Sequence, residues 1–297
     1  MKQISIDVRG FQFDAYEAGP VDGPLVLLLH GFPQSAWAFR HQVEALGQAG
    51  YHAVAPDQRG YSPGARPLEV EAYASSEMVD DALAIADHFG AEKFHLLGHD
   101  WGAGIAWNLA GQHGHRLITL TALSVPHPFA FSRAIAGEAP ADGTVNDQGD
   151  RSSYFAVFAS PDAEDIFLAD DASMLEQMFI TTGLASEDAR YYTDRMRNRP
   201  ALTAALNWYR AAFQSPEITM AVMASMQPIT MPTLYVWSTE DPALGKLGAD
   251  LNGEYMAGPY TYVVLEGVGH WISEQVPDRL TELLLTHLGS VDRPPAD

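Results

Sequence analysis

The stretch FHLLGHDWG at residues 94–102 decides the fold of this chain. Its first four residues form a short, mostly apolar run, which is typical of a strand buried on both faces of a sheet. Gly98-His99-Asp100-Trp101-Gly102 follows directly, and its outer glycines allow a sharp turn. A helix rich in small residues is predicted from Ala103. Strand, turn and helix in this order present the central side chain at the carboxyl end of a sheet.

Strands and helices alternate outward from this stretch along the 297-residue chain. Between about 131 and 227 the rhythm changes, and helical patterns and polar loops occur without a buried strand. We expect an α/β fold with a mostly parallel, doubly wound sheet, a core of residues 1–130 and 228–297, and an inserted helical cap of residues 131–227. The other predicted strands lie within residues 4–16, which hold two, and at 24–29, 52–57, 117–125, 233–237 and 260–265.

The composition excludes several classes of protein. The chain has 17 Lys and Arg against 38 Asp and Glu, a net charge of −21, and no cysteine. Such a chain repels nucleic-acid phosphates and anionic membranes, so neither partner is expected. The absence of cysteine rules out disulfides, thiolate metal sites and a cysteine nucleophile. There is no apolar run of membrane-spanning length and no signal-peptide pattern, so a cytoplasmic protein is expected.

Asp100 stands at the nucleophile position of a G-x-nucleophile-x-G turn. An aspartate, with an ordinary pKa of about 3.9, is ionised at neutral pH without help from a base. A carboxylate attacks a saturated carbon better than an ester carbonyl, and the product is an ester between substrate and enzyme. Hydrolysis of that ester requires a histidine base and an oxyanion hole. The alternative is that Asp100 only caps the following helix.

Partners for Asp100 are expected later in the chain, in the order acid and then histidine. Asp241 follows the predicted strand at 233–237, and we prefer it to its neighbour Glu240 as the acid. His270 follows the last predicted strand in the sequence GVGH, and would take a proton from water while Asp241 fixes its tautomer. No pattern indicates a metal site, and no cofactor is expected.

Two backbone amides are expected to form the oxyanion hole. The sequence HGFP at residues 30–33 directly follows the predicted strand at 24–29, and its Phe32 amide is one expected donor. The other is the amide of Trp101, directly after Asp100. His30 is expected to support this loop rather than to transfer protons.

The chain resembles the epoxide hydrolases of the α/β-hydrolase fold. The resemblance lies in HGFP at 30–33, DQRGYS at 57–62, GHDWG at 98–102, and a cap placed before the acid and the histidine. It implies two cap tyrosines that hydrogen-bond the epoxide oxygen. The segment LNWYR makes Tyr209 the second of these, and SYFAVF makes Tyr154 the candidate for the first, with Tyr191 and Tyr192 as competitors.

This resemblance implies that an epoxide is opened to a vicinal diol through a covalent Asp100 ester, which water activated by His270 then hydrolyses. Phe129, Phe155 and Trp271 are expected in the pocket wall, together with Phe32 and Trp101. The expected partners are therefore a small apolar or aromatic epoxide and water. A homodimer formed through the cap is compatible with the sequence.

Two alternatives remain open. A haloalkane dehalogenase would use the same Asp100, Asp241 and His270, and that family shares the Asp-Trp pair. It usually has Asn or Glu in place of Phe32, however, and fluoroacetate dehalogenases favour Arg where this chain has Trp101. A halide site also needs N–H donors rather than acidic hydroxyls. The other alternative, from a different class, is a binding protein of the same fold without catalysis.

Overall fold

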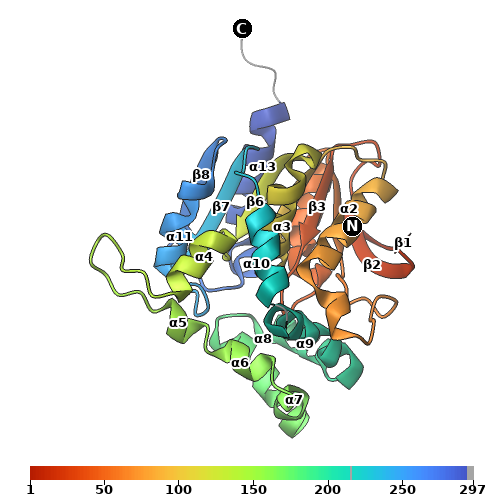
Figure 1. The fold of residues 1–297 in the computed structure, drawn as a ribbon. Helices are drawn as coiled ribbons and strands as arrows, with labels where there is room; N and C mark the ends of the chain where they lie inside the picture. Colours follow the sequence, from red (N-terminus) through yellow and green to blue (C-terminus); the bar gives the residue numbers. More distant parts are fainter. Residues whose placement is uncertain (215, 293–297) are drawn as a thin grey trace.

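The centre of the molecule is an eight-stranded sheet in the order β1-β2-β4-β3-β5-β6-β7-β8 (Figure 1). The structure is a computed structural model, and it describes residues 1–214 and 216–292. The strands are β1 (Lys2–Val8), β2 (Phe11–Ala18), β3 (Leu25–Leu29), β4 (His52–Pro56), β5 (Phe94–His99), β6 (Leu117–Leu123), β7 (Thr233–Ser238) and β8 (Tyr260–Leu265). Strands β3 to β8 are parallel, whereas β2 is antiparallel to both β1 and β4.

Helices cover both faces of this sheet (Figure 1). Helix α1 packs on α13 and on β4, whereas α2 and α3 pack on each other and on β3. The helices are α1 (Arg40–Gln48), α2 (Ser75–His88), α3 (Trp101–His113), α4 (Pro128–Ile135), α5 (Gln148–Arg151), α6 (Tyr154–Phe158), α7 (Ala163–Thr181), α8 (Ser186–Met196), α9 (Arg199–Gln214), α10 (Pro216–Ser225), α11 (Lys246–Leu251), α12 (Ile272–Gln275) and α13 (Pro277–Asp292). Short 3₁₀ helices are η1 (Ala36–Phe39), η2 (Val70–Tyr73), η3 (Gly114–Arg116) and η4 (Asn252–Tyr255).

The apolar runs form strands because each one is covered on both faces. Every residue of β3 is buried. Leu27 and Leu29 belong to the hydrophobic cluster on one face of the sheet, and Val26 and Leu28 belong to the cluster on the other face. Side chains alternate between the faces along a strand, so a continuous apolar run is what a doubly covered sheet requires.

The direction of strand addition reverses beside β3. The chain places β4 on one side of β3 and then crosses to the other side before it forms β5. Leu29, at the end of β3, pairs with Gly98 near the end of β5. Sites in open α/β sheets form at the carboxyl ends of the strands where this reversal occurs. The segments that follow β3 and β5 are therefore brought together.

Between β6 and β7 the described residues form helices and loops but no strand. Helices α5 to α9 form a layer beyond the carboxyl ends of the parallel strands (Figure 1). The two ends of this segment rest on the rest of the molecule, because α4 contacts α11 and α10 contacts α3. The division into a core of 1–130 and 228–297 and a cap of 131–227 stays a prediction, and its first limit falls inside α4.

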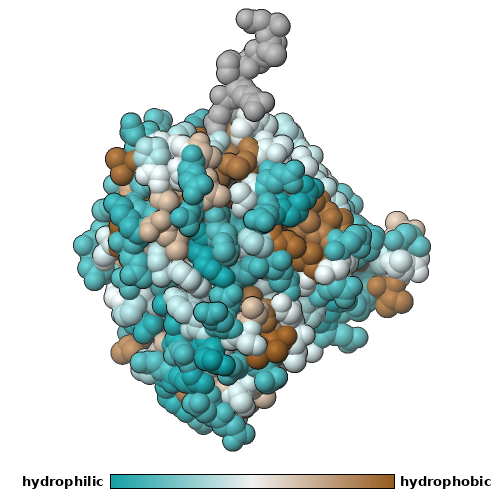
Figure 2. Space-filling view, turned by 180° about the vertical axis from the view of Figure 1, so that it is seen from behind, coloured by the Kyte–Doolittle hydropathy of each residue, from teal (hydrophilic) through white to brown (hydrophobic). Residues whose placement is uncertain are grey.

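The face seen in Figure 2 is mostly hydrophilic, and its hydrophobic residues form separate patches. This surface agrees with the large excess of acidic residues in the sequence. Within residues 1–214 and 216–292, no helix combines the length and apolar character needed to span a membrane.

Candidate active site

Asp100 occupies a strained turn between β5 and α3. Its backbone has φ 53° and ψ −124°, a conformation that L-residues rarely adopt. The neighbouring glycines make the turn possible, because a Cβ at Gly98 would lie 2.2 Å from the Gly102 carbonyl oxygen. A Cβ at Gly102 would lie 2.0 Å from the carbonyl oxygen of Leu29. The GHDWG sequence is therefore required by the close approach of three backbone segments.

The loop after β3 holds one oxygen of the Asp100 carboxylate. The Phe32 amide donates a hydrogen bond of 2.8 Å to Asp100 Oδ1. Gly31 allows this approach, since a Cβ there would lie only 2.3 Å from the same oxygen. The backbone amide of Trp101 also stabilises the ionised carboxylate. The structure thus places both amides expected for an oxyanion hole at Asp100.

Asp241 and His270 form a hydrogen-bonded pair in the loops after β7 and β8. Asp241 Oδ2 lies 2.8 Å from His270 Nδ1. The other oxygen of Asp241 accepts hydrogen bonds from the amides of Ala243 at 2.8 Å and Leu244 at 3.1 Å. Glu240, the competing acid in the sequence, is exposed. The side chain that faces His270 is therefore that of Asp241.

His270 also faces Asp100. Its Nε2 lies 3.5 Å from Asp100 Oδ2. Burial alone would lower the pKa of His270, but the charges of Asp241 and Asp100 outweigh burial and raise it to about 10. Burial would likewise raise the pKa of Asp100, but His270, with His99 and the Trp101 amide, holds it below its ordinary value. At neutral pH the resting site holds an imidazolium between two carboxylates.

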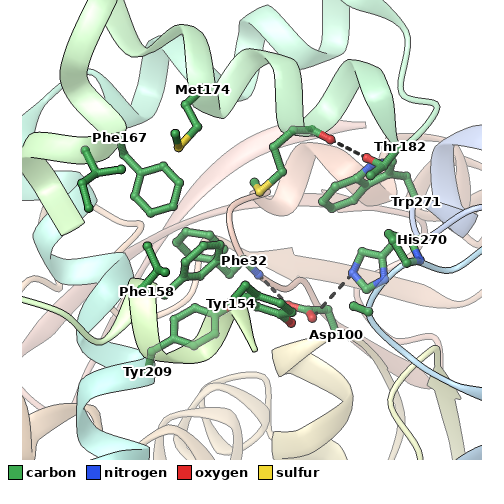
Figure 3. A pocket seen from close by; sticks show the side chains of 15 residues that line it. Phe32, Asp100, Tyr154, Phe158, Phe167, Met174, Thr182, Tyr209, His270 and Trp271 are labelled. Carbon is green, nitrogen blue, oxygen red and sulfur yellow. Dashed lines mark hydrogen bonds and ion pairs between the residues drawn. The ribbon is translucent and has the colours of Figure 1, made fainter. Parts of the chain in front are cut away.

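Tyr154 and Tyr209 lie beside Asp100, with His270 on the other side of the carboxylate (Figure 3). Tyr154 begins α6 and Tyr209 belongs to α9, and their ring centroids are 6.3 Å apart. Burial, with a contribution from the charge of Asp100, raises the pKa of both phenols well above its ordinary value. Both hydroxyls therefore stay protonated and can donate hydrogen bonds towards a ligand on Asp100.

The competing tyrosines lie elsewhere. Tyr192 donates a hydrogen bond of 2.7 Å from its hydroxyl to Glu274 Oε1. Tyr191 packs on Trp37, with ring centroids 5.5 Å apart. Neither residue lines the cavities at Asp100. Of the tyrosines considered from the sequence, the structure brings Tyr154 and Tyr209 to the carboxylate.

Two cavities meet at Asp100, one of about 500 Å³ and one of about 240 Å³. Of the five residues expected in the pocket wall, Phe32 and Trp271 line the larger cavity, and Trp101 and Phe155 line the smaller one. Phe129, the fifth, lines neither cavity. Its ring stacks on His127 and Tyr255 beside a different hollow, because it follows Pro128 in the first turn of α4 and faces the segment before β8.

Sequence reasoning missed much of the larger cavity. Its far wall comes from α7, whose Phe167 and Met174 lie across the space from Asp100 (Figure 3). Phe158, one turn after Tyr154, packs on Phe167 with ring centroids 4.9 Å apart and on Phe32 with ring centroids 5.2 Å apart. The only signal in the sequence was the apolar face of these helices, which does not distinguish a cavity wall from a packed interface.

Sequence reasoning also missed a buried polar network behind His270. Gln34 Nε2 donates a hydrogen bond of 2.5 Å to Glu274 Oε2, and Gln34 Oε1 lies 3.1 Å from His99 Nδ1. His99 Nε2 lies 2.8 Å from the carbonyl oxygen of His270. Arg40 binds Glu274 at 2.9 Å and also pairs with Asp188 of α8. The network therefore links the inserted helices to the backbone of His270.

His30 has the supporting position expected of it. Its ring is buried, and its Nε2 accepts a hydrogen bond of 3.1 Å from the Gln58 amide. Burial, the largest cause, lowers the pKa of His30 to about 4, so the ring is neutral. Among the described residues there is no cluster of three or more His, Cys, Asp or Glu side chains suited to a metal ion.

The reversal point of the sheet, the strained turn after β5, and the order Asp100, Asp241, His270 define a class of protein. Residues 24–277 match the alpha/beta hydrolase fold family, and the chain belongs to that family. The fold class and the family expected from the sequence are confirmed.

Several individual proteins are similar to this chain along almost its whole length. The chain is 31% identical over 320 residues to Epoxide hydrolase A of Mycobacterium tuberculosis, with 97% of each chain covered. It is 32% identical over 289 residues to the AB hydrolase superfamily protein YfhM of Bacillus subtilis, covering 95% of this chain and 96% of that protein. The crystal structure of Epoxide Hydrolase A from Mycobacterium thermoresistibile matches with a TM-score of 0.81 at 30% identity, covering 97% of this chain and 98% of that one.

Proposed function

We propose that this protein hydrolyses epoxides to vicinal diols through a covalent ester on Asp100. One observation carries the proposal. A buried carboxylate is fixed by the Phe32 amide and lies beside two protonated tyrosines, Tyr154 and Tyr209, at one end of an apolar cavity. Relatives named epoxide hydrolase, similar along almost the whole chain, give independent support.

In the first step Asp100 attacks a ring carbon of the epoxide. The Phe32 amide holds Oδ1, so Oδ2 is the oxygen that is free to attack. The new Oδ2–C bond forms as the C–O bond of the ring breaks on the opposite side. The ring oxygen leaves as an alkoxide and takes a proton from Tyr154 or Tyr209. This donor is needed because an unprotonated alkoxide is a poor leaving group.

In the second step His270 becomes the base. Formation of the ester removes the negative charge of Asp100, which is one of the two carboxylates that raise the pKa of His270. That pKa then falls, the imidazolium proton returns to the tyrosinate left by the first step, and the neutral His270 can take a proton from water. Asp241 keeps the ring oriented through the 2.8 Å contact at Nδ1.

The activated water attacks Cγ of the Asp100 ester. The charge that develops on Oδ1 is stabilised by the amides of Phe32 and Trp101, which already contact the resting carboxylate. The Cγ–Oδ2 bond breaks and the departing diol oxygen takes the proton from His270. The carboxylic acid that remains on Asp100 then gives the second proton of the water to His270, which restores the carboxylate and the imidazolium. Water supplies the oxygen that stays on Asp100, and no cofactor takes part in these steps.

The proposal is tested by single-turnover hydrolysis of styrene oxide in ¹⁸O water, with mass spectrometry of the peptide containing Asp100. One labelled oxygen in that carboxylate is the expected result. In a His270→Gln variant the alkyl-enzyme should accumulate and be visible by intact mass. Label found only in the diol, or rapid turnover by the variant, would contradict the covalent mechanism.

Bromoalkanes and simple esters tested in parallel separate this activity from the other uses of the fold. A dehalogenase would release bromide and leave epoxides intact. A non-catalytic binder would turn over nothing, yet its ligand would raise its melting temperature. The described groups beside Asp100 favour the epoxide, because Tyr154 and Tyr209 present hydroxyls, which suit an epoxide oxygen better than a halide.

A further inference from the structure

The two cavities at Asp100 share three residues, which are Asp100, Tyr154 and Ala243. A ring bound between the carboxylate and Tyr154 therefore has space on two sides. A terminal epoxide carries a substituent on one ring carbon only, and such a substrate would leave one cavity unused. Two cavities accommodate a ring that is substituted at both carbons.

The larger cavity has almost no polar surface outside the reaction centre. Of the described residues that line it, Thr182 is the only polar one besides Asp100, His270 and the two tyrosines. Its hydroxyl donates to the Met178 carbonyl at 2.6 Å and accepts from Trp271 Nε1 at 2.7 Å, so it is already used. This cavity suits a purely apolar substituent.

The smaller cavity follows one face of α3. Asp100, Gly104 and Asn108 are each four residues apart, so they lie on the same side of the helix, and all three line the cavity. Gly104 contributes no side chain, and a Cβ built there meets no atom within 4 Å. The glycine therefore leaves a path open from the carboxylate towards Asn108.

Asn108 can receive a polar group at the end of that path. Its side chain is half-buried, and within the described chain no hydrogen bond is made by its amide. The eight residues from Asp100 span about 12 Å along the helix axis. After allowance for the Asn108 side chain and a hydrogen bond, about five carbon atoms reach from the ring to the amide.

The charges around the smaller cavity indicate that the polar group is neutral. The described lining of the smaller cavity contains no Lys, Arg or His, and its only ionised group is Asp100. A carboxylate would have no cation to pair with there and would be repelled by Asp100. A neutral hydroxyl or amide can both donate to and accept from the Asn108 amide.

We propose that the preferred substrate is an internal epoxide with a longer apolar substituent in the larger cavity and a shorter one whose neutral polar end hydrogen-bonds Asn108. The inference rests on the proposed epoxide hydrolysis. It assigns substrate selection to two residues of α3, with Gly104 providing the passage and Asn108 the polar contact.

Three matched epoxides test the wild-type enzyme by kcat/KM. They are trans-6,7-epoxytetradecan-1-ol, trans-6,7-epoxytetradecane, and 1,2-epoxynonane, which keeps only the heptyl substituent. We expect the alcohol to exceed the internal alkane epoxide by about threefold to tenfold, the value of one hydrogen bond. We expect the internal alkane epoxide to exceed the terminal one by on the order of tenfold or more, because its pentyl group is buried.

Two variants assign these preferences to residues, each read as a ratio between substrates measured on the same preparation. Asn108→Leu should abolish the advantage of the alcohol over the alkane epoxide. Gly104→Leu should lower the ratio of internal to terminal epoxide by about tenfold or more, because its side chain enters the smaller cavity. Gly289→Leu in α13, another helical glycine with open space at its Cβ, is the control and should change neither ratio.

The outcomes separate the two proposals. If wild-type enzyme turns over only the terminal epoxide, or if Gly104→Leu and Asn108→Leu leave both ratios unchanged, the substrate assignment is wrong while epoxide hydrolysis stands. If none of the three epoxides is hydrolysed and Asp100 takes up no label, epoxide hydrolysis itself is wrong and the assignment fails with it.

Discussion

Replacement of Gly31 by alanine tests whether the position of the Asp100 carboxylate limits the reaction. The added Cβ would lie 2.3 Å from Asp100 Oδ1, whereas ordinary contacts begin at 3.4 Å, so the groups must separate by about 1.1 Å. Asp100 cannot simply yield, because its strained backbone is enclosed by Gly98 and Gly102. The 2.8 Å hydrogen bond from the Phe32 amide to Oδ1 would then be lost.

A displacement of about 1 Å in a reacting group costs roughly 100-fold in rate. We therefore expect Gly31→Ala to form the alkyl-enzyme about 100 times more slowly, measured by rapid quench and intact mass. Some loss of stability is also expected, on the order of 1–3 kcal/mol from overpacking, so circular dichroism and thermal unfolding must show that the variant is folded at the assay temperature.

Gly289→Ala is the matched control, because a Cβ at that helical position meets nothing within 4 Å. It should react at the wild-type rate. A folded Gly31→Ala variant that forms the alkyl-enzyme within about threefold of the wild-type rate would refute the reasoning, since the carboxylate would then tolerate the displacement.

Three further predictions concern groups around the site. The double variant Tyr154→Phe, Tyr209→Phe should stay folded but form the Asp100 ester about 100-fold or more slowly, because no acidic hydroxyl remains for the epoxide oxygen. Single-turnover mass spectrometry measures this rate, and a normal rate of ester formation would contradict the prediction. Burial, the largest cause, raises the pKa of Glu274 from 4.5 to about 7. The folded state therefore holds this proton more tightly than the unfolded chain, and the stability from it, complete below pH 4.5, is lost as the pH rises to about 7. Glu274→Gln should remove this dependence in guanidinium unfolding at pH 5 and pH 8, and an equal difference from wild type at both values would count against it. Phe129→Ala should leave kcat/KM for styrene oxide unchanged, because its ring lies at a separate hollow, and a tenfold loss would return Phe129 to the substrate pocket.

Features that depend on local constraints could be predicted from the sequence. The Asp100 turn could be predicted from its flanking glycines, because a Cβ at either one would lie under 2.5 Å from a backbone carbonyl oxygen. The hairpin of β1 and β2 could be predicted from Arg9 and Gly10, which both adopt positive φ. In each place the chain has few alternatives, and the residue type shows it.

Features that depend on distant packing could not be predicted. Phe129 follows Pro128 at the start of α4 close to the site in sequence, yet its direction is set by His127 and Tyr255, and the latter comes from 126 residues later. Met174 reaches the cavity only because of how α7 packs on α8 and α9. No local pattern encodes such packing, since the apolar face of a helix specifies burial and not its partner.

The left-handed backbone at Asp100 has a consequence for how such a scaffold can change its chemistry. The steric demands of the turn fall on Gly98, Gly102 and Gly31, and not on the side chain they present. The side chain at position 100 can therefore be exchanged while the backbone of the turn stays the same. A lineage that keeps the three glycines can exchange one reactive group for another by a single amino-acid substitution, and its catalytic repertoire can diversify while its architecture stays the same.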